Sequence, residues 1–382
     1  MKQKKNNKEL LYNIGFIKRT FAPIYYSTGG RYTNGNFPLI NKTIIENKPK
    51  SVFCIFDVPD YHDFKCKAHF NVLQSKQYNG SFLQLLKYKS VDDFIEKTFR
   101  PKKRTEFKKF IRKLNVTITP EFKVIIGPET ELKEIDNALS ALFNLIYLRF
   151  KGKGIYNRFT EIENQNKLRT ELEILIIQNK ASIAYLKIAS HYISVSVQYH
   201  QNDIVLYSIP SFDDSFSKYN LGHIHLYYLI NYCFEKGFSK FDFSKGDGIY
   251  KSKWTTSEYN YFHYFLYPKN SFFLKYIACY FKLKYDLIQY FREKDYNTIY
   301  KKLTYSFKYL WGSWKLHKQD ISSTMLISDS ITDKIFSLSP YFKSKFFNFI
   351  YDKEFHINDI ESITTYGNKI NLIINENVID CV

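Results

Sequence analysis

The sequence predicts an α/β fold built from mixed, mostly antiparallel sheets. Two observations carry this prediction. Four short apolar runs separated by polar turns lie between residues 172 and 209, and an apolar helix begins at Gly222. A strand, a glycine-rich turn and another strand then follow between residues 238 and 267. A chain of 382 residues with 45% hydrophobic content can bury a large core without a metal or disulfide.

The first elements are strands, followed by a capped helix. Residues 52–56 form a short apolar run that ends at Asp57 and Pro59, as expected of a buried strand. Residues 82–88 are a second strand candidate. Ser90 is a good N-cap, and the acids after it suit a helix start. The first fifty residues show only turn signals.

A basic helix is predicted next. In residues 100–114, Phe107, Phe110, Ile111 and Leu114 recur at helical spacing, with cations on the opposite face. Residues 116–119 and 124–126 are predicted strands, and apolar periodicity predicts a helix over 131–150. The glycines in residues 151–154 mark a boundary between the two halves of the chain.

The second half contains the clearest pattern. Residues 172–177, 182–188, 192–199 and 204–209 are predicted strands of an antiparallel meander, because the turns between them are short. The helix from Gly222 ends near Lys236, and Gly237 stands where a C′ glycine is expected. Residues 238–243 and 259–267 are predicted strands around a turn at 246–248. The tail, over about 270–318, is a run of basic aromatic helices, with short strands near Met325 and Ile370.

Charge and cysteine content exclude some classes of protein. With 56 Lys and Arg against 37 acids, the net charge of +19 attracts nucleotide phosphates, acidic glycans, lipid headgroups or nucleic acid, without selecting among them. Part of that charge reflects the bias towards Lys that is expected of an AT-rich genome. Five scattered cysteines argue against a zinc site and a disulfide framework. No signal peptide or spanning segment is recognisable, so the cytoplasm is the predicted compartment.

The start of the Gly222 helix is a candidate phosphate site. Its segment is Tyr219-Asn-Leu-Gly-His-Ile-His225. The first N–H groups of a helix have no partner within it and carry partial positive charge, so they can cradle a pyrophosphate. A glycine there lets a ligand approach the backbone. An ordinary helix start after a loop is the alternative.

The segment over residues 238–254 carries the most specific motif. An aspartate on a strand is followed by Gly-Asp, then Tyr-Lys and an aromatic residue; these positions are Asp242, Gly246, Asp247, Tyr250, Lys251 and Trp254. This pattern resembles the signature that closes the domain of GNAT-type acetyltransferases of the BioF2-like or cellulose-biosynthesis CelD-like family. Gly248 departs from the family, which commonly has a carboxylate there.

The resemblance covers about residues 85–270 and has implications for fold and co-substrate. It implies a FemAB-like tandem of two GNAT-like domains, an N-terminal one over residues 1–150 and an acyl-CoA-binding one over 151–268. Residues 269–382 form a C-terminal helical extension. Acetyl-CoA or another acyl-CoA is the implied co-substrate. Its binding residues would be Asn220, Leu221, Gly222, His223, Ile224 and His225.

The resemblance also implies catalytic roles, which suit the residue types. Tyr250 can protonate the leaving thiolate, Lys251 can stabilise the oxyanion or the phosphates, and Asp242 can hold or deprotonate the acceptor amine. Asp247 and Trp254 are candidate substrate contacts. Plainer interpretations are an i,i+4 ion pair between Asp247 and Lys251 and simple packing of the aromatic rings.

Metal binding is not expected. His223 and His225 could ligate a metal, but the sequence shows no third ligand at a recognised spacing. A helix-start polar residue and a packed residue are the preferred interpretation of this pair.

The predicted function is therefore an N-acyltransferase that moves an acyl group from acyl-CoA to an amine. An amino sugar or a cell-surface polysaccharide precursor is the expected acceptor. One alternative is a FemAB-like transferase that uses aminoacyl-tRNA. Another is a non-enzymatic nucleic-acid-binding protein using the basic helix over residues 100–113; a solvated basic face is the preferred explanation of that helix.

The tail suggests a further partner. Residues 272–284 are aromatic and basic, as in helices that lie on an anionic membrane surface, which would suit a lipid-linked acceptor. The same helix could instead pack on the protein. The sequence does not predict the oligomeric state.

Overall fold

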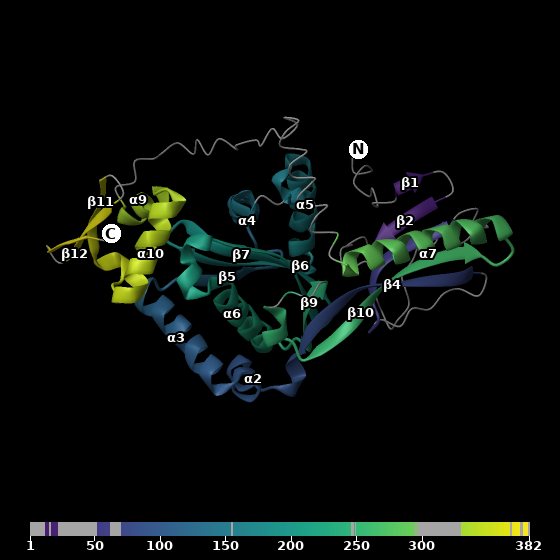
Figure 1. The fold of residues 1–382 in the computed structure, drawn as a ribbon, viewed down its shortest axis with the longest axis horizontal. Coiled ribbons are helices and arrows are strands. Elements are labelled where there is room, and N and C mark those ends of the chain that lie inside the picture. Colours follow the sequence, from purple (N-terminus) through teal and green to yellow (C-terminus); the bar gives the residue numbers. More distant parts are fainter. Residues whose placement is uncertain are drawn as a thin grey trace. The chain divides into compact units, whose positions relative to one another are not determined.

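The computed structural model describes residues 12–14, 17–21, 52–61, 70–153, 156–245, 248, 250–294, 296, 330–366, 369–374 and 377–380. Figure 1 shows their helices and strands. The chain splits into two compact units. Unit 1 consists of Met1–Leu86, Tyr199–Tyr207 and Ser239–Lys301, and unit 2 consists of Lys87–Gln198, Ser208–Phe238 and Lys302–Val382.

Unit 1 contains a mixed sheet. Its strands are β1 (Tyr12–Ile14), β2 (Ile17–Phe21), β3 (Val52–Pro59), β4 (Phe70–Gln84), β9 (Lys240–Lys245) and β10 (Ser257–Pro268). Strand β10 pairs antiparallel with both β3 and β4, and β4 pairs antiparallel with β9. Strands β2 and β3 are parallel, as are β9 and the beginning of β8 (Ile204–Phe212). The short helices η2 (Leu85–Lys87) and η5 (Lys251–Lys253) follow β4 and β9.

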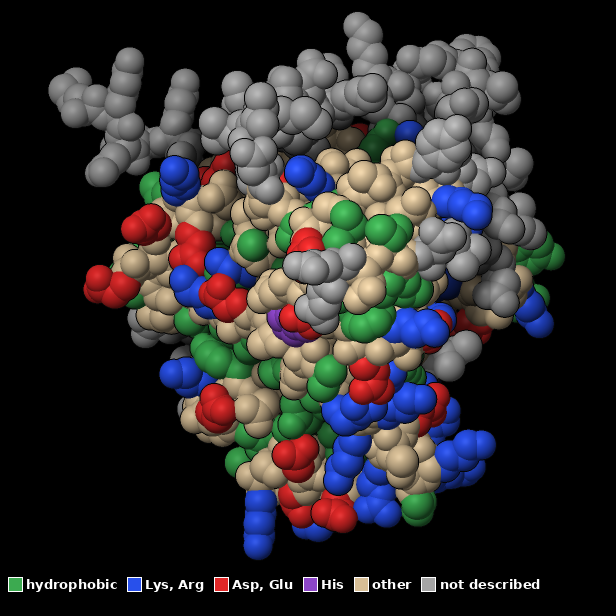
Figure 2. Space-filling view, turned by 90° about the vertical axis from the view of Figure 1, so that its left-hand side faces the viewer, with side chains coloured by type: hydrophobic (Ala, Val, Ile, Leu, Met, Phe, Trp, Pro, Cys, Tyr) green, Lys and Arg blue, Asp and Glu red, His purple; other side chains and the backbone are tan. Residues whose placement is uncertain are grey.

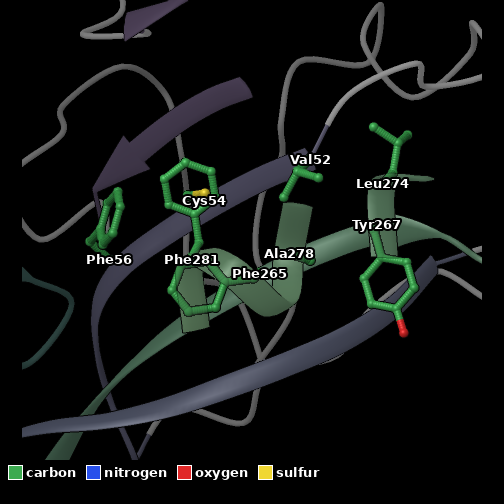
Figure 3. Packing of buried hydrophobic residues seen from close by; sticks show 8 residues of the cluster. All are labelled: Val52, Cys54, Phe56, Phe265, Tyr267, Leu274, Ala278 and Phe281. Carbon is green, nitrogen blue, oxygen red and sulfur yellow. The ribbon is translucent and has the colours of Figure 1, made fainter. Parts of the chain in front are cut away.

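One long helix covers a face of this sheet. Helix α7 (Phe272–Glu293) begins at the N-cap Ser271, whose side chain accepts a hydrogen bond from the Leu274 N–H. Figure 3 shows its residues Leu274, Ala278 and Phe281 packed against side chains of β3 and β10. These helix residues recur at intervals of four and three, so they form one apolar stripe that faces the sheet.

Unit 2 also contains strands. They are β5 (Glu121–Ile125), β6 (Ala181–Ile188), β7 (His191–Gln201) and the second half of β8, hydrogen-bonded in the order β8-β7-β6-β5. Ala189 and Asn202, in the two-residue turns after β6 and β7, adopt left-handed backbone conformations. The predicted strands over 182–188, 192–199 and 204–209 are confirmed by β6, β7 and β8.

The helices of unit 2 include most of those expected from the sequence. They are α2 (Val91–Thr98), α3 (Pro101–Thr117), α4 (Leu132–Lys153), α5 (Ile162–Ile177), α6 (Leu221–Glu235), α9 (Ile331–Ser337) and α10 (Pro340–Lys353), with the short helices η3 (Arg158–Thr160), η4 (Asp214–Tyr219) and η6 (Ile357–Asp359). Ser90 caps α2 by accepting a hydrogen bond from the Asp93 N–H. Gly237 follows α6 with a φ of 72°, the left-handed conformation expected at C′.

Two predicted strands, over 172–177 and 116–119, and one predicted strand boundary are wrong. Residues 172–177 are the end of helix α5, in which Leu172, Leu175 and Ile176 are buried while Ile174 and Ile177 are exposed. The short apolar run fits a helix with one buried face as well as it fits a strand, so periodicity over six residues did not separate them. Residues 116–117 belong to the last turn of α3, and β4 ends at Gln84 instead of Tyr88.

The C-terminal region is not helical throughout. After α9 and α10, strands β11 (Ile360–Tyr366), β12 (Lys369–Ile374) and β13 (Asn377–Asp380) form a small antiparallel sheet. The strand expected near Ile370 is confirmed by β12, whereas the one near Met325 lies outside the described residues. The α/β class is confirmed; the tandem of GNAT-like domains with boundaries after residues 150 and 268 stays a prediction.

Candidate functional site

The carboxylate of Asp242, on β9, is fully buried in unit 1. Its Oδ2 accepts a hydrogen bond from the Tyr61 hydroxyl at 2.6 Å, and its Oδ1 accepts one from the Ser244 N–H at 2.6 Å. The Tyr259 hydroxyl lies 2.7 and 2.8 Å from the two oxygens. The hydroxyl of Tyr261 is 2.7 Å from that of Tyr259. Three tyrosines and a carboxylate therefore form one hydrogen-bonded chain.

The surroundings of this carboxylate make it a stronger base than an exposed one. Burial raises the pKa of Asp242, although hydrogen bonds from Tyr61, Tyr259 and the Ser244 N–H act against that shift. Burial, together with the charge of Asp242, raises the pKa of Tyr259 well above its ordinary value. Tyr259 therefore keeps its proton, and Asp242 is the group in this cluster that is suited to accept one.

A lysine stands beside this cluster. Lys240 lies two residues before Asp242 on β9, and its Nζ sits 4.1 Å from the ring centre of Tyr61 and 4.3 Å from that of Phe82. Burial lowers the pKa of Lys240, and the charge of Asp242 acts in the opposite direction. A partly desolvated ammonium held over two aromatic rings is attracted by their electron-rich faces.

Glycine in β4 makes room for Tyr259. A Cβ placed on Gly80 would overlap the ring of Tyr259, so a side chain at this position would displace that ring. The β4–β10 pairing puts Tyr259 directly opposite Gly80, next to an irregularity in register after Asn260. Gly80 therefore positions one of the hydrogen-bond donors of Asp242. The sequence offers no signal for this role, because it depends on the register between distant strands.

Lys251 is the first residue of η5, and its side chain reaches back to the end of β9. Its side chain is buried, and its Nζ donates hydrogen bonds to the carbonyl oxygens of Lys245 at 2.6 Å and of Ser244 at 3.3 Å. Ser244 has a φ of 61°, in the left-handed region. Lys251 thus stabilises the backbone just after Asp242. Its role at an oxyanion or at phosphates stays a prediction.

The other residues of the motif differ in exposure. Tyr250 is 37% exposed, and its ring lies against Gly248, where an added Cβ would be 2.9 Å from the ring. A side chain at Gly248 would therefore push on Tyr250. Trp254 is fully buried, so its ring packs in the core; a substrate contact for Trp254 stays a prediction. Asp247 lies outside the described residues.

The predicted cofactor residues form the first turn of α6, in unit 2. Asn220 precedes the helix with a φ of 57°, its side chain makes no capping hydrogen bond, and no acid stands in the first turn. The N–H groups of His223 and Ile224 donate to the Asn220 carbonyl at 2.9 and 3.3 Å. Leu221 and Ile224 are buried. An anion at this end would therefore meet the earliest N–H groups of the helix.

Gly222 has a packing role that the sequence did not reveal. A Cβ at this position would lie 2.9 Å from the ring of Phe212, at the end of β8. The glycine therefore allows close contact between the helix start and an aromatic ring. The close approach of a ligand to the protein backbone at Gly222 stays a prediction.

His225 is packed against strand β7. Its Nδ1 lies 2.9 Å from the Ser194 hydroxyl and its Nε2 lies 2.6 Å from the Ser196 hydroxyl, and the ring is fully buried. Burial lowers the pKa of His225 to about 3, so the ring is neutral. The structure thus agrees with the interpretation of His225 as a packed residue; its place among the cofactor-binding residues stays a prediction.

Arg149 is a candidate site residue that the sequence did not predict. Arg149, near the end of α4, has its guanidinium 4.1 Å from the centre of the Phe212 ring that touches Gly222. Its Nε is buried without a hydrogen-bond partner and lies 3.8 Å from Asp214 Oδ1. A guanidinium packed on the ring that touches a helix start can contribute positive charge for a phosphate group. These residues therefore suit the pyrophosphate of a coenzyme A ligand.

Buried histidines give the protein a pH-dependent stability. Burial lowers the pKa of His263 to about 4, that of His200 to about 4 and that of His225 to about 3. The unfolded chain binds these protons near pH 6.5, so the free energy of unfolding falls as the pH falls from 6.5 towards 4. Asp242 acts in the opposite direction, since burial favours its protonated form in the folded state.

We expect His263→Gln to reduce this pH dependence. In the folded protein His263 Nδ1 accepts a hydrogen bond from the Asp57 N–H, which requires the neutral ring. Its lowered pKa, about 4, should account for about 2 kcal/mol of the loss between pH 7 and 5. Urea unfolding of both proteins at the two pH values measures this. An unchanged pH dependence in His263→Gln would contradict the assignment.

Comparisons with known proteins identify one family match. Residues 101–252 match the family described as acetyltransferase (GNAT) domain, a span that includes α6, Asp242, Tyr250 and Lys251. No curated protein matches the chain.

Among the described residues, no group of three or more His, Cys, Asp or Glu side chains is placed to hold a metal ion.

Three solved structures show weak similarity. FemX is 12% identical, with a TM-score of 0.42, and the match covers 62% of this chain and 77% of that one. A conserved protein of unknown function from Bacteroides thetaiotaomicron is 13% identical, with a TM-score of 0.37 and coverage of 59% and 73%. A GCN5-related N-acetyltransferase from Kribbella flavida is 9% identical, with a TM-score of 0.32 and coverage of 70% and 86%.

The family match agrees with the resemblance recognised in residues 238–254. It begins at the first residue of α3 and ends just after Lys251, so it includes both the α6 start and the Asp242 strand. Residues 101–252 of this chain are thus similar to the family described as acetyltransferase (GNAT) domain.

Proposed function

We propose that the protein is an N-acyltransferase that moves an acetyl or other acyl group from acyl-CoA to an amine. The observation that carries this proposal is the GNAT match over residues 101–252, because that family implies an acyl-CoA co-substrate. An amino sugar or a cell-surface polysaccharide precursor is the proposed acceptor class. The residues described above can supply the binding and proton-transfer steps that the reaction needs.

In the proposed reaction the amine nitrogen attacks the thioester carbonyl carbon. A C–N bond forms, the C–S bond breaks, and the products are an amide and the CoA thiol. The nitrogen loses a proton and the thiolate gains one. General acid–base catalysis of such transfers typically contributes about 10²–10⁴-fold in rate.

Asp242 is the proposed final acceptor of the amine proton. Its carboxylate is fully buried, so the amine reaches it through the Tyr61 hydroxyl, which is partly buried and donates to Asp242 Oδ2 at 2.6 Å. As Tyr61 takes a proton from the amine, its own proton passes to Asp242. The raised pKa of Asp242 favours that transfer. Tyr250 is the proposed donor of a proton to the thiolate.

Binding of the CoA pyrophosphate is assigned to the α6 start and Arg149. The first turn of α6 contains no acid, and the side chain of Asn220 leaves the end of the helix uncapped. Arg149 adds a guanidinium with a buried Nε that makes no hydrogen bond. In this proposal the partial positive charge of the helix start and the charge of Arg149, which also lies 3.8 Å from Asp214, both attract the anion.

Thermal unfolding with acetyl-CoA, longer acyl-CoAs and CoA tests this assignment. Ligand at 100 times its Kd should stabilise the wild-type protein by about 2.7 kcal/mol. Arg149→Met should weaken binding by about tenfold or more, because a charge-assisted hydrogen bond is lost. Arg158→Met is the matched control, since Arg158 also stacks on a phenylalanine, in η3. The absence of stabilisation by any CoA ligand would contradict the proposed function.

An aminoacyl-tRNA donor is the second candidate, and the basic helix α3 is the feature that favours it. Figure 2 shows Lys and Arg side chains gathered on the lower part of the face that carries α2 and α3. Several of these cations already have acidic partners: Arg104 lies 3.3 Å from Glu96, and Arg112 and Lys113 lie 2.9 and 2.8 Å from Glu354. Such pairing weakens the case for nucleic acid. A steep salt dependence of tRNA binding would restore it.

A further inference from the structure

Helix α7 has apolar residues on two opposite sides. One side holds Leu274, Ala278 and Phe281, which are buried against β3 and β10 as Figure 3 shows. Among the residues described, no helix is long and apolar enough to cross a membrane. A helix with only one face on a protein core normally presents polar residues on its other face. Helix α7 does not follow that rule.

The opposite side of α7 exposes large apolar side chains along the whole helix. Phe272 is 81% exposed, Tyr276 is 74% exposed and Leu283 is 69% exposed. Steps of three and four residues along a helix place side chains on one face. The residues connected by such steps, here called the outer face, are Phe272, Tyr276, Tyr280, Leu283, Leu287 and Tyr290. Exposed apolar patches of this kind mark interaction surfaces.

Cations flank the outer face. At 100° per residue, Lys275 falls on one side of the face and Lys284 on the other, and both are exposed. Lys294 follows the last turn. The two acids of the helix already have partners: Asp286 accepts from Lys282 and Ser75, and Glu293 accepts from Gln289. The outer face is thus an apolar strip bordered by positive charge.

We propose that the outer face of α7 docks on the surface of an anionic lipid bilayer. The helix lies parallel to the surface, with its phenylalanine and leucine side chains at the acyl boundary and Lys275 and Lys284 among the lipid phosphates. Three tyrosines suit this position, since their rings are apolar and their hydroxyls can stay in water. This inference does not depend on acyl transfer.

Charge favours a lipid surface over a second copy of the chain. In a symmetric pair of outer faces the flanking lysines of one copy would approach those of the other, and like charges oppose such contact. Anionic headgroups instead neutralise them. The net charge of +19 for the whole chain acts in the same direction.

Co-sedimentation of the full-length protein with lipid vesicles tests the proposal. The wild-type protein should bind vesicles of phosphatidylcholine mixed with phosphatidylglycerol and should bind pure phosphatidylcholine much more weakly. Leu283→Ser/Leu287→Ser should lower the partition coefficient by about 100-fold, because two apolar side chains no longer enter the lipid. Lys275→Gln/Lys284→Gln should lower it by about tenfold or more on the anionic vesicles only.

Matched controls separate this surface from general hydrophobicity. Leu132 and Leu148, on α4, are 56% and 44% exposed, so Leu132→Ser/Leu148→Ser removes two exposed leucines elsewhere and should bind vesicles as the wild type does. Urea unfolding of all variants reports on folding, and their CoA binding reports separately on the proposed function. Absence of wild-type binding to anionic vesicles overturns the proposal. It is equally overturned if the protein dimerises and the α7 leucine variant abolishes dimerisation.

Discussion

Asp242→Asn is expected to lower kcat by about 10²–10⁴-fold while the protein stays folded, because a proton acceptor is lost. The amide oxygen of asparagine can still accept hydrogen bonds from the Ser244 N–H and from Tyr259, which in the wild type lie 2.6 and 2.7 Å from Oδ1. Its amide nitrogen cannot accept from Tyr61. The acidic limb of the pH profile of kcat/KM should also disappear. Steady-state kinetics with acyl-CoA and an amine acceptor measure both effects.

Tyr259→Phe is the control for this variant. It removes one donor to Asp242 and leaves the carboxylate and the Tyr61 contact in place. Its effect on kcat should be much smaller than that of Asp242→Asn, and urea unfolding shows whether either variant loses stability. If Asp242→Asn transfers acyl groups at the wild-type rate with a wild-type pH profile, Asp242 is not the base.

Tyr250→Phe is expected to reduce kcat by a similar factor, about 10²–10⁴-fold, with the affinity for acyl-CoA kept. The substitution removes one hydroxyl, so the leaving thiolate loses its proton donor. Because the side chain is 37% exposed and its ring contact with Gly248 is retained, folding should change little. Single-turnover rates and CoA titrations separate chemistry from binding.

Tyr341→Phe provides the matched variant, since Tyr341 is 57% exposed and lies on α10. It should behave as the wild type does. Lys251→Met is the third variant. The wild-type Lys251 ammonium donates hydrogen bonds to two backbone carbonyls, so its removal should reduce the free energy of unfolding as well as the rate. Acylation by Tyr250→Phe at the wild-type rate would show that this part of the motif is structural.

Local patterns predicted much of the fold because they depend on neighbouring residues. The N-cap Ser90, the helix from Leu221 with Gly237 after it, and strands β6, β7 and β8 are encoded within windows of a few residues. The motif over residues 238–254 identified Asp242, on strand β9, as a residue of interest. Where a window was short, as in residues 172–177, the same apolar run fitted helix and strand, and only packing on one face decided for α5.

The partners of Asp242 depended on tertiary structure. Tyr61 lies 181 residues away in the chain, and Gly80 makes room for Tyr259 only because β4 and β10 pair in one register. Likewise, Arg149 meets the α6 start through the ring of Phe212. Sequence periodicity tells which side of a helix or strand is apolar. It does not tell which distant side chain fills the space opposite, because that depends on strand order and register across the whole chain.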